Sequence, residues 1–443
     1  MIMTSKSYVN LFRESAPYIH AHRGKTFVIA LTGEAVDGPN RFSLLADIAV
    51  LHSIGVRIIL VHGARPQIDK RLSEAGFRST FHDDIRISDS KMMPYIEEAI
   101  VSTRLQLEKL LSMGLPNPPM FGAQIRTVSG NFTIAKPVGI RNGIDHLFCG
   151  EVRRIDKGAI ESALDSGSVV IIPPIGFSST GEVFNLSYQD LASEVASFMK
   201  AEKLIFISSL DGVYIDGELQ KRLSLTTLAK LIACDKVQSG LERKILQSAY
   251  KCCSNQVARV HLITEKSDGA ILSELFTREG TGTLISEDKS ETIRQAKIED
   301  IGGLLELIQP LEQRGILVKR SRERLEVEIA KFYVSIHPEG FMVGCAALYP
   351  LNDNMGEIAC VATHPDFTKQ GTASRLLTVI EERAKQKSIS SLFVLTTHAA
   401  HWFIEKGFTE CGPDLLPEDK KLLYNYKRNS KVLSKKMDLQ FAM

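Results

Sequence analysis

The stretch from Gly356 to Leu377 (GEIACVATHPDFTKQGTASRLL) combines residue types that could bind an anion. The apolar run 358–363 has the length of a buried strand, and the loop 364–373 holds a proline, a glycine and small residues. From Ala373 onward, apolar residues recur at three- and four-residue spacing, as in a helix. Such a strand–loop–helix unit can hold a phosphate, because free backbone N–H groups and the positive end of the helix dipole point the same way. An ordinary connection has the same pattern, so the segment alone leaves both interpretations open.

Two side chains in this stretch could take part directly in a reaction. Glu357 opens the strand, where a carboxylate could accept a proton directly or through one water, or could simply be a polar residue at a strand end. A nucleophilic Cys360 would need a positioned base or a lowered pKa. The nearest histidine in sequence, His364, lies four residues on in extended chain, which is too far for a hydrogen bond. Because cysteine is often simply buried, we exclude a covalent intermediate on Cys360.

Two basic clusters could bind carboxylates. The tail 422–433 (LLYNYKRNSKVL) carries Arg428 and Ser430 among alternating apolar residues, and the segment 319–322 (KRSR) stands at a helix entry. Arginine suits this work because its planar fork can grip a carboxylate with two hydrogen bonds. Solvated surface charge is the alternative for both clusters. An RNA-binding tail is disfavoured, since no aromatic-basic RNP pattern accompanies it.

The elements that must position these residues follow an alternating pattern. Between Lys25 and Thr264, apolar runs of strand length alternate with helical patterns; the runs are 27–31, 56–61, 169–175, 204–208 and 260–264. This alternation is typical of βαβ units and a mainly parallel sheet covered on both faces. The polar segment around 286–291 (SEDKSE) precedes a second series of strands and helices. We therefore predict domains 1–285 and 293–443, joined by a linker 286–292.

The composition excludes several classes of protein. The 443 residues include 44% hydrophobic and 24% charged residues, which is ordinary for a soluble protein of two or three domains. The formal net charge of +2 favours neither nucleic acid nor membrane as a partner. The seven cysteines form no CxxC motif, so neither a disulfide scaffold nor a metal site is predicted. Because no apolar run of membrane-spanning length or signal-peptide core is present, we expect a cytoplasmic protein.

Residues from about 292 to the C-terminus resemble the GNAT superfamily of acetyl-CoA-dependent N-acetyltransferases. The segments that carry the resemblance are 293–308 (IRQAKIEDIGGLLELI), 368–373 (TKQGTA) and 402–408 (WFIEKGF). The loop departs from the family pattern Arg/Gln-x-x-Gly-x-Gly/Ala because Thr368 stands first, which weakens a side-chain contact to pyrophosphate and leaves the backbone cradle possible. The resemblance implies an α/β fold with splayed central strands and acetyl-CoA as co-substrate.

The same resemblance assigns roles to individual residues. Glu357 matches the general base, and Thr396 matches a hydroxyl acid for the leaving thiolate, although a threonine at a strand end is usually structural. Backbone N–H groups near Cys360 and Val361 would stabilise the oxyanion, provided that the strand is bulged there. The implied acetyl-CoA contacts are Cys360, Val361, Ala362, Lys369, Gln370, Gly371, Thr372 and Ala373.

Residues from about 24 to 285 resemble the amino acid kinase family, which has the fold of acetylglutamate kinase. The matching segments are 30–34 (ALTGE), 62–67 (HGARPQ), 184–186 (FNL), 210–213 (LDGV) and 279–283 (EGTGT). Working kinases of the family carry a lysine where Ala30 stands and an acidic residue where Gln189 stands, whereas a second family lysine corresponds to Lys244. Since phosphoryl transfer depends on positioned charges, the resemblance implies an α/β/α sandwich with a mainly parallel sheet that has lost ATP chemistry.

Such a domain could be a scaffold, an oligomerisation platform or an amino-acid sensor. Arginine-sensitive members of the family combine an N-terminal helix, here with Tyr18, and a later loop. The corresponding arginine contacts would be Tyr18, Glu274, Gly280 and Gly282. A buried Glu274 could accept a charge-assisted hydrogen bond from a guanidinium, although surface exposure is the commoner fate of a glutamate.

The two resemblances in this order match the family of bacterial two-domain N-acetylglutamate synthases over nearly the whole chain. That match implies acetyl transfer from acetyl-CoA to the α-amine of L-glutamate by direct attack in a ternary complex, as the first step of arginine biosynthesis. It also implies feedback inhibition by L-arginine, a homo-oligomer, expected to be a hexamer, and glutamate contacts from Arg320, Arg428 and Ser430. Two alternatives stay open: acetylglutamate kinase-like activity, and a GNAT enzyme that acetylates another amine.

Overall fold

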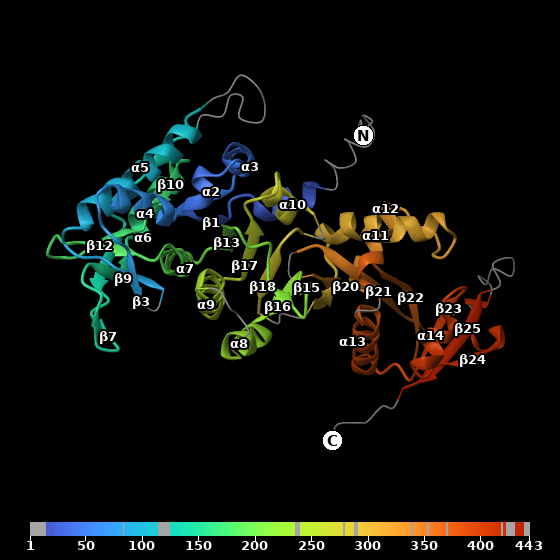
Figure 1. Ribbon diagram of the computed structural model, residues 1–443. Helices are drawn as coiled ribbons and strands as arrows, with labels where there is room; N and C mark the ends of the chain where they lie inside the picture. Colours follow the sequence, from blue (N-terminus) through green and yellow to red (C-terminus); the bar gives the residue numbers. More distant parts are fainter. Residues whose placement is uncertain are drawn as a thin grey trace. The chain divides into compact units, whose positions relative to one another are not determined.

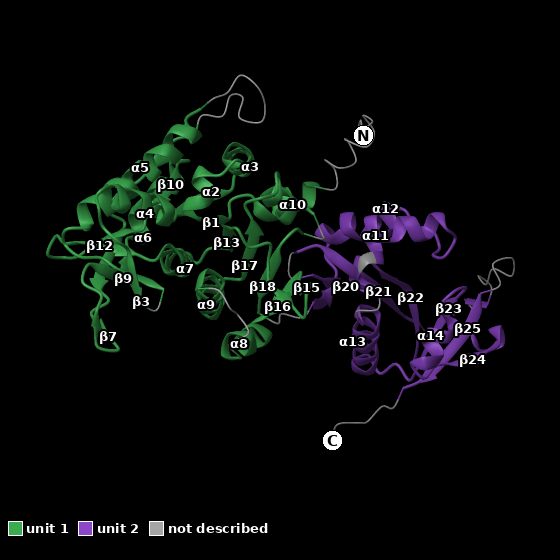
Figure 2. Ribbon diagram, viewed as in Figure 1, with its two compact units in different colours: residues 1–288 green, residues 289–443 purple. Residues whose placement is uncertain are grey.

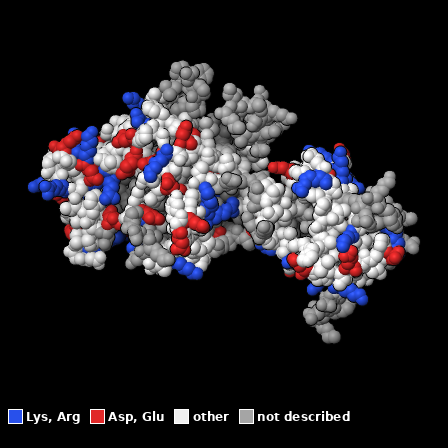
Figure 3. All heavy atoms as spheres, turned by 45° about the vertical axis from the view of Figure 1, so that its right-hand side comes forward, with Lys and Arg blue, Asp and Glu red and all other residues white. Residues whose placement is uncertain are grey.

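The computed structural model divides into two compact units, residues 1–288 and residues 289–443 (Figures 1 and 2). It describes residues 15–82, 84–113, 125–234, 240–277, 280–287, 291–337, 340–351, 354–368, 371–417, 420–421 and 430–437. Among these residues, no helix is both long enough and apolar enough to cross a membrane. On the face drawn in Figure 3, basic and acidic side chains are interspersed over both units.

The first unit is built on one large sheet that is parallel except at the β17–β18 pair. Its strands, in spatial order, are β16 (Arg222–Ser224), β18 (Thr283–Ser286), β17 (Arg259–Thr264), β13 (Lys203–Ser208), β1 (Thr26–Leu31), β2 (Arg57–His62), β10 (Val169–Ile172) and β5 (Thr127–Val128). The central strands read as continuous apolar runs because both faces of the sheet are covered. The mainly parallel sheet predicted from the sequence is confirmed.

Helices on the two faces complete the sandwich. Along β1, Val28 and Ala30 pack into one hydrophobic core, and Phe27, Ile29 and Leu31 pack into the other. The first core holds α6 (Lys157–Asp165), α7 (Tyr188–Met199), α8 (Leu225–Ala233) and α9 (Gly240–Ser254). The second core holds α2 (Gly33–Asp37), α3 (Arg41–Ser53), α10 (Ala270–Phe276) and part of α5 (Met93–Leu111). The alternation of side chains along each strand therefore sorts the sequence into two cores.

Smaller elements extend this unit on one side. The helix α4 (Arg65–Glu74) packs against α5 in a separate apolar cluster. Four strands hydrogen-bond in a closed ring: β6 (Thr133–Pro137), β9 (Cys149–Ile155), β11 (Ile175–Phe177) and β12 (Val183–Leu186). Short pairs are β3 (Thr80–His82) with β4 (Ile85–Ile87), β7 (Ile140–Arg141) with β8 (Ile144–Asp145), and β14 (Tyr214–Ile215) with β15 (Glu218–Leu219). The predicted N-terminal helix with Tyr18 is present over residues 15–22, and residues 1–14 lie outside the described residues.

The second unit is a mixed sheet with helices on both faces (Figure 1). Its strands, in spatial order, are β19 (Thr292–Gln295), β20 (Phe332–Ile336), β21 (Met342–Pro350), β22 (Met355–Thr363), β23 (Ser391–Thr396), β25 (Lys431–Lys436) and β24 (Thr409–Cys411). The helices α11 (Ile301–Gln313) and α12 (Arg322–Glu328) cover one face, whereas α13 (Thr372–Gln386) and α14 (Ala400–Glu405) cover the other. The 3₁₀ turns are η1 (Ile298–Asp300), η2 (Ile329–Lys331), η3 (Pro365–Phe367) and η4 (Pro413–Leu415).

The two central strands of this sheet separate partway along their length. The parallel pairing of β22 with β23 runs from Met355 opposite Ser391 to Ile358 opposite Val394, and then stops. Both strands continue beyond that point, β22 to Thr363 and β23 to Thr396. The unpaired halves enclose a space at the centre of the sheet, which confirms the predicted splayed strands.

Candidate active site

A β-bulge marks the point where the central strands part. The register between β21 and β22 shifts by one residue, so Cys360 and Val361 together stand opposite Ala346. Cys360 has φ of +53°, a left-handed conformation that a non-glycine residue rarely adopts. A bulged residue is released from regular pairing, and its neighbouring N–H groups turn away from the ladder. The bulge on which the predicted oxyanion site depends is therefore present at the predicted residues.

A cavity of about 510 Å³ opens from the bulge towards the start of α13. It is lined by Ile316, Leu317, Ile358, Ala359, Cys360, Val361, Thr363, Phe367, Thr368, Gly371, Thr372, Ala373, Ser374, Val394, Leu395, Thr396, His398, Ala399, Trp402 and Phe403. Gly371 precedes α13 with φ of +80° and caps it with no side chain, so the first N–H groups of the helix lack a side-chain acceptor at this position. An elongated ligand with an anionic part at the helix start fits this space.

Most of the predicted acetyl-CoA contacts line this cavity. Val361, Gly371, Thr372 and Ala373 lie along it, and Cys360 stands at its inner end. Ala362, by contrast, is 3% exposed and packs into the core beneath α11, so its side chain does not line the cavity. Lys369 and Gln370 lie outside the described residues.

A second cavity, of about 230 Å³, also borders the bulge. Its lining residues are Ile316, Leu317, Val318, Arg320, Arg324, Tyr349, Glu357, Ile358, Ala359, Cys360, Leu395, Lys420 and Ser430. It shares six lining residues with the larger cavity: Ile316, Leu317, Ile358, Ala359, Cys360 and Leu395. The two cavities therefore meet at the bulge, and a group in one can reach a group in the other.

Glu357 stands in the smaller cavity with a single ion-pair partner among the described residues. The residue is 8% exposed, and its Oε2 lies 2.5 Å from Nζ of Lys420. Lys420 was not predicted, because its local sequence PEDKKLL shows only mixed charge. Glu357 is therefore buried, paired with one lysine and adjacent to open space.

Arg320 supplies a donor to the same cavity. Ser321 caps α12 by accepting the N–H of Arg324, which fixes the chain at Arg320 immediately before the helix. The Nη1 of Arg320 donates to the carbonyl of Val318 at 2.9 Å, whereas its buried Nε has no hydrogen-bond partner among the described residues. A buried guanidinium N–H without a partner is costly, so this atom points to a missing acceptor such as a ligand carboxylate. Ser430 also lines the cavity, and Arg428 lies outside the described residues.

Tyr349, also absent from the sequence-based prediction, forms part of the wall of the smaller cavity. Its hydroxyl donates to Oε2 of Glu328 at 2.7 Å. Burial and this hydrogen bond raise the pKa of Tyr349, so the phenol stays neutral. Tyr349 is therefore a polar, uncharged boundary for the cavity.

Of the two features that could make Cys360 nucleophilic, a lowered pKa and a positioned base, the described residues provide only the first. A hydrogen bond from the Cys345 thiol lowers the pKa of Cys360 against the effect of burial, and the charge of Arg320 acts in the same direction. No imidazole contacts the Cys360 sulfur among the described residues. Direct attack without an acyl-cysteine stays our prediction.

Thr396 lies at the end of β23, on the larger cavity. Its Oγ1 accepts N–H hydrogen bonds from His398 at 3.3 Å and from Ala399 at 3.0 Å. A hydroxyl oxygen has two acceptor positions and one donor, so these bonds leave the O–H able to donate into the cavity. The structural and catalytic interpretations of Thr396 are therefore compatible.

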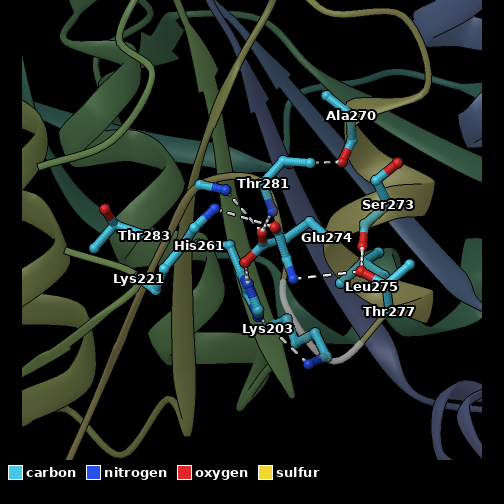
Figure 4. Close-up of polar contacts among 12 residues, drawn as sticks. Lys203, Lys221, His261, Ala270, Ser273, Glu274, Leu275, Thr277, Thr281 and Thr283 are labelled. Atoms are coloured by element: carbon cyan, nitrogen blue, oxygen red, sulfur yellow. Dashed lines mark hydrogen bonds and ion pairs between the residues drawn. The ribbon is translucent and has the colours of Figure 1, made fainter. Parts of the chain in front are cut away.

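In the first unit, Glu274 is the centre of a buried polar cluster (Figure 4). Its Oε1 lies 2.8 Å from Nδ1 of His261, and its Oε2 accepts the N–H groups of Thr281 at 2.7 Å and Gly282 at 3.0 Å. Nε2 of His261 lies 3.4 Å from Nζ of Lys203. Burial alone would raise the pKa of Glu274, but the His261 contact and the two N–H groups lower it overall. His261 and Lys203 escaped prediction because they lie on neighbouring strands far from Glu274 in sequence.

The other predicted arginine contacts gather around this cluster. Tyr18 packs edge-on against Phe276 of α10, with 6.5 Å between ring centroids, and His22 bonds through Nε2 to the Leu275 carbonyl at 3.0 Å. A side chain at Gly280 would meet Oε2 of Glu274 at 2.6 Å, and one at Gly282 would meet the Leu262 carbonyl at 1.9 Å. Gly282 is thus required by the close approach of the Leu262 backbone, and Gly280 is favoured by its φ of +60° beside the Glu274 carboxylate.

A third cavity, of about 710 Å³, occupies the place that corresponds to a kinase site. Gly33, Gly63, Gln189 and Lys244 are among its lining residues, as the resemblance implies. Ala30 is not among them; it is fully buried in the core. Asp190, one residue after Gln189, pairs with Lys244 at 2.8 Å and supplies a carboxylate that the sequence comparison overlooked. Loss of ATP chemistry stays a prediction that rests on Ala30 and Gln189.

Comparison with known proteins gives consistent results for both halves. Residues 25–264 match the amino acid kinase family, and residues 305–408 match the acetyltransferase (GNAT) family. An amino-acid acetyltransferase of Pseudomonas putida is 45% identical over 97% of this chain and 99% of its own. One of Escherichia coli is 47% identical over 95% of this chain and 96% of its own.

Solved structures agree with these relatives. The crystal structure of N-acetylglutamate synthase from Neisseria gonorrhoeae, complexed with coenzyme A and L-arginine, covers 98% of this chain and 100% of its own, with a TM-score of 0.82 and 35% identity. The same synthase complexed with coenzyme A and N-acetyl-glutamate gives a TM-score of 0.61 over 97% of this chain and 99% of its own, again at 35% identity. The relatives that match over nearly the whole chain are amino-acid acetyltransferases, and the two cavities that meet at a bulge beside a buried carboxylate agree with that activity. This chain belongs to the amino-acid acetyltransferase family.

Proposed function

We propose that this enzyme transfers the acetyl group of acetyl-CoA to the α-amine of L-glutamate in a ternary complex and is inhibited by L-arginine. The observation that carries the proposal is the meeting of two cavities at the Cys360 bulge. The larger cavity starts at a helix N-terminus, which suits the pyrophosphate of acetyl-CoA. The smaller cavity holds a carboxylate and several cations, which suits an amino dicarboxylic acid.

The acceptor side of the reaction falls to Glu357. The α-amine of glutamate is protonated in water near neutral pH and must lose a proton before it attacks. Glu357 lies beside the bulge in the acceptor cavity and can take this proton directly or through one water. As the ammonium group approaches, Lys420 loses its place beside Glu357 by like-charge repulsion and can turn to a substrate carboxylate.

Binding of glutamate falls to the cations around the smaller cavity. The buried Nε of Arg320 offers a donor to one carboxylate, and Arg324 and Lys420 lie along the same wall. From the family resemblance, Arg428 and Ser430 complete the set. L-Glutamate carries two carboxylates. This explains why several positively charged side chains surround a cavity that contains a single protein carboxylate, Glu357.

The donor side falls to the backbone of the bulge and to Thr396. N–H groups near Cys360 and Val361 can donate to the oxyanion of the tetrahedral intermediate, which is the step where hydrogen bonds contribute most. Thr396 can donate its O–H to the departing thiolate from the wall of the larger cavity. Because amine, thioester and acid can be present together, no covalent enzyme intermediate is needed.

Inhibition by L-arginine is proposed to act at the cluster around Glu274. Glu274, His261 and Lys203 form a buried polar group against the N-terminal helix, and a ligand there would compete with internal hydrogen bonds.

We also propose that the enzyme is a cytoplasmic homo-oligomer, expected to be a hexamer. Light scattering on the purified protein would measure this oligomeric state.

The test is thiol release from acetyl-CoA across a panel of amino acids, with and without L-arginine. We expect rapid release with L-glutamate and suppression of that release by L-arginine. Trp402, the only tryptophan in the chain, lines the larger cavity, so we expect its fluorescence to change when coenzyme A binds. Absence of both thiol release and fluorescence change would refute the proposal, and release with a different amine would refute glutamate as acceptor.

A further inference from the structure

Glu291 binds three groups near the start of α13, although it lies outside every cavity described above. Its Oε1 accepts from the Thr372 hydroxyl at 2.9 Å, and its Oε2 accepts from the Ser335 hydroxyl at 2.7 Å and from Nη2 of Arg375 at 2.8 Å. We propose that Glu291 is a positioning residue for acetyl-CoA, which sets Thr372 and Arg375 at the anion-binding end of the larger cavity. The proposal rests on the function proposed above.

The carboxylate is held firmly enough to act as a fixed point. The Glu291 side chain is 8% exposed, and Ser335 and Thr372 are 0% and 1% exposed. Burial alone would raise the pKa of Glu291, but the hydrogen bonds from Arg375, Ser335 and Thr372 lower it overall. Glu291 is therefore an ionised, bonded carboxylate near neutral pH.

Thr372 is the first residue of α13 and lines the cavity. Its methyl group packs closely on β21, where a side chain at Gly344 would meet Cγ2 of Thr372 at 2.9 Å. Because Gly371 provides no side-chain cap, the direction of the first helical N–H groups depends on how Thr372 is held. The bond to Glu291 fixes the remaining freedom of that side chain.

Arg375 brings a positive charge to the same place. Its Nη2 also lies 3.3 Å from Oγ1 of Thr372, and its Nη1 lies 3.2 Å from where a Cβ of Gly371 would stand. The guanidinium thus lies beside the glycine of the predicted pyrophosphate loop, and Glu291 sets its orientation. A pyrophosphate at the helix start would meet both the backbone N–H groups and this guanidinium.

The negative charge of Glu291 and its orienting role have opposite effects on the binding of an anionic ligand. The direction in which the affinity changes therefore distinguishes the two roles. If the carboxylate acted only through its charge, its removal would strengthen the binding of an anion. If it acts by orienting Arg375 and Thr372, its removal weakens binding. In Glu291→Gln the amide can still form hydrogen bonds with the Ser335 and Thr372 hydroxyls. The amide has no negative charge, so the ion pair that orients Arg375 is lost.

The experiment compares Glu291→Gln with wild type in steady-state kinetics and in coenzyme A titrations followed by Trp402 fluorescence. We expect the KM for acetyl-CoA and the Kd for coenzyme A to rise about tenfold, with kcat and the KM for glutamate changed less than twofold. Glu381→Gln is the matched control, because it breaks a 2.8 Å pair with Lys435 farther along the same helix. It should leave the coenzyme constants unchanged.

A double-mutant cycle with Arg375→Gln separates positioning from general support of the fold. If Glu291 acts through Arg375, the double variant binds coenzyme A no worse than Arg375→Gln alone. Unchanged or tighter coenzyme binding in Glu291→Gln, an equal rise of both KM values, or additive losses in the cycle would each overturn the inference. Failure of the wild type to bind coenzyme A would instead refute the proposed function.

Discussion

Each unit contains a buried glutamate at its candidate site, and the partners of the two residues differ. Glu274 in the first unit is 9% exposed and Glu357 in the second is 8% exposed, so burial does not separate them. Glu274 accepts from His261 and from two backbone N–H groups, all on fixed elements. Glu357 faces a cavity and one lysine side chain.

This difference predicts different work for the two carboxylates. A carboxylate whose lone pairs accept hydrogen bonds from rigid donors holds a loop in place. It does not readily exchange these partners for a ligand. A carboxylate paired with one long, adaptable side chain can exchange that partner for a substrate ammonium group and take its proton. We therefore expect Glu357 to control the rate and Glu274 to control regulation and stability.

The largest effect should follow from Glu357→Gln. This change keeps the size of the side chain and removes its basicity, so kcat should fall by roughly 10²- to 10⁴-fold. Coenzyme A binding, followed by Trp402 fluorescence, should stay as in wild type. The control is Glu410→Gln, which breaks an exposed 3.0 Å pair with Lys431 in the same unit. A loss smaller than tenfold in Glu357→Gln would place the base elsewhere.

Next in size is the effect of Arg320→Gln on glutamate binding. Loss of a charged donor to a carboxylate is worth about 2 kcal/mol, so the KM for glutamate should rise roughly thirtyfold. The KM for acetyl-CoA should change less than twofold. Arg322→Gln is the matched control, since its side chain is 66% exposed and pairs with Glu326 on the helix surface. Equal changes in both KM values would remove Arg320 from the substrate site. Arg428→Ala should act in the same direction.

The first unit is tested by Glu274→Gln, where we expect roughly a tenfold loss of arginine inhibition and an unchanged kcat. The amide places a donor near the N–H groups of Thr281 or Gly282, so the loop loses its anchor. Glu194→Gln, which breaks a pair with Lys251 in the same unit, serves as control. Normal arginine inhibition in Glu274→Gln would show that regulation does not depend on this cluster.

The pKa of Glu274 also fixes the sign of an acid effect. Because the folded pKa lies below the usual 4.5, the unfolded chain binds more protons at acid pH. The stabilisation from Glu274 is therefore complete above pH 4.5 and is lost as the pH falls through the folded pKa. Urea unfolding of wild type and Glu274→Gln should diverge above pH 4.5 and converge below it.

Sequence patterns were sufficient where structure is local. The apolar runs of the parallel sheet and the strand–loop–helix unit from Gly356 to Leu377 follow from periodicity and glycine placement alone. The partners of the buried carboxylates could not be read in this way. His261 reaches Glu274 from β17, and Lys203 of β13 contacts His261 in turn. Lys420 reaches Glu357 across 63 positions of the chain, which only the fold brings together. The ion pair of Asp190 with Lys244 was likewise invisible to a comparison position by position.

The smallest effect at neutral pH should come from His22, which ties the N-terminal helix to α10. Burial, and after it the charge of Lys203, lowers the pKa of His22 from 6.5 to about 4. The unfolded chain therefore binds a proton between these values that the folded chain excludes, so stability falls as the pH falls from 6.5 towards 4, by about 3 kcal/mol in all. His22→Gln keeps a donor for the Leu275 carbonyl and should remove the contribution of His22 to this pH dependence. The buried His62, whose pKa also falls to about 4, keeps its separate contribution. Thermal unfolding between pH 7 and pH 5 should show a drop in Tm several degrees smaller in His22→Gln than in wild type, with the exposed His20→Gln unchanged as control. Equal drops in wild type and His22→Gln would mean that the buried imidazole does not couple protonation to the fold of the first unit.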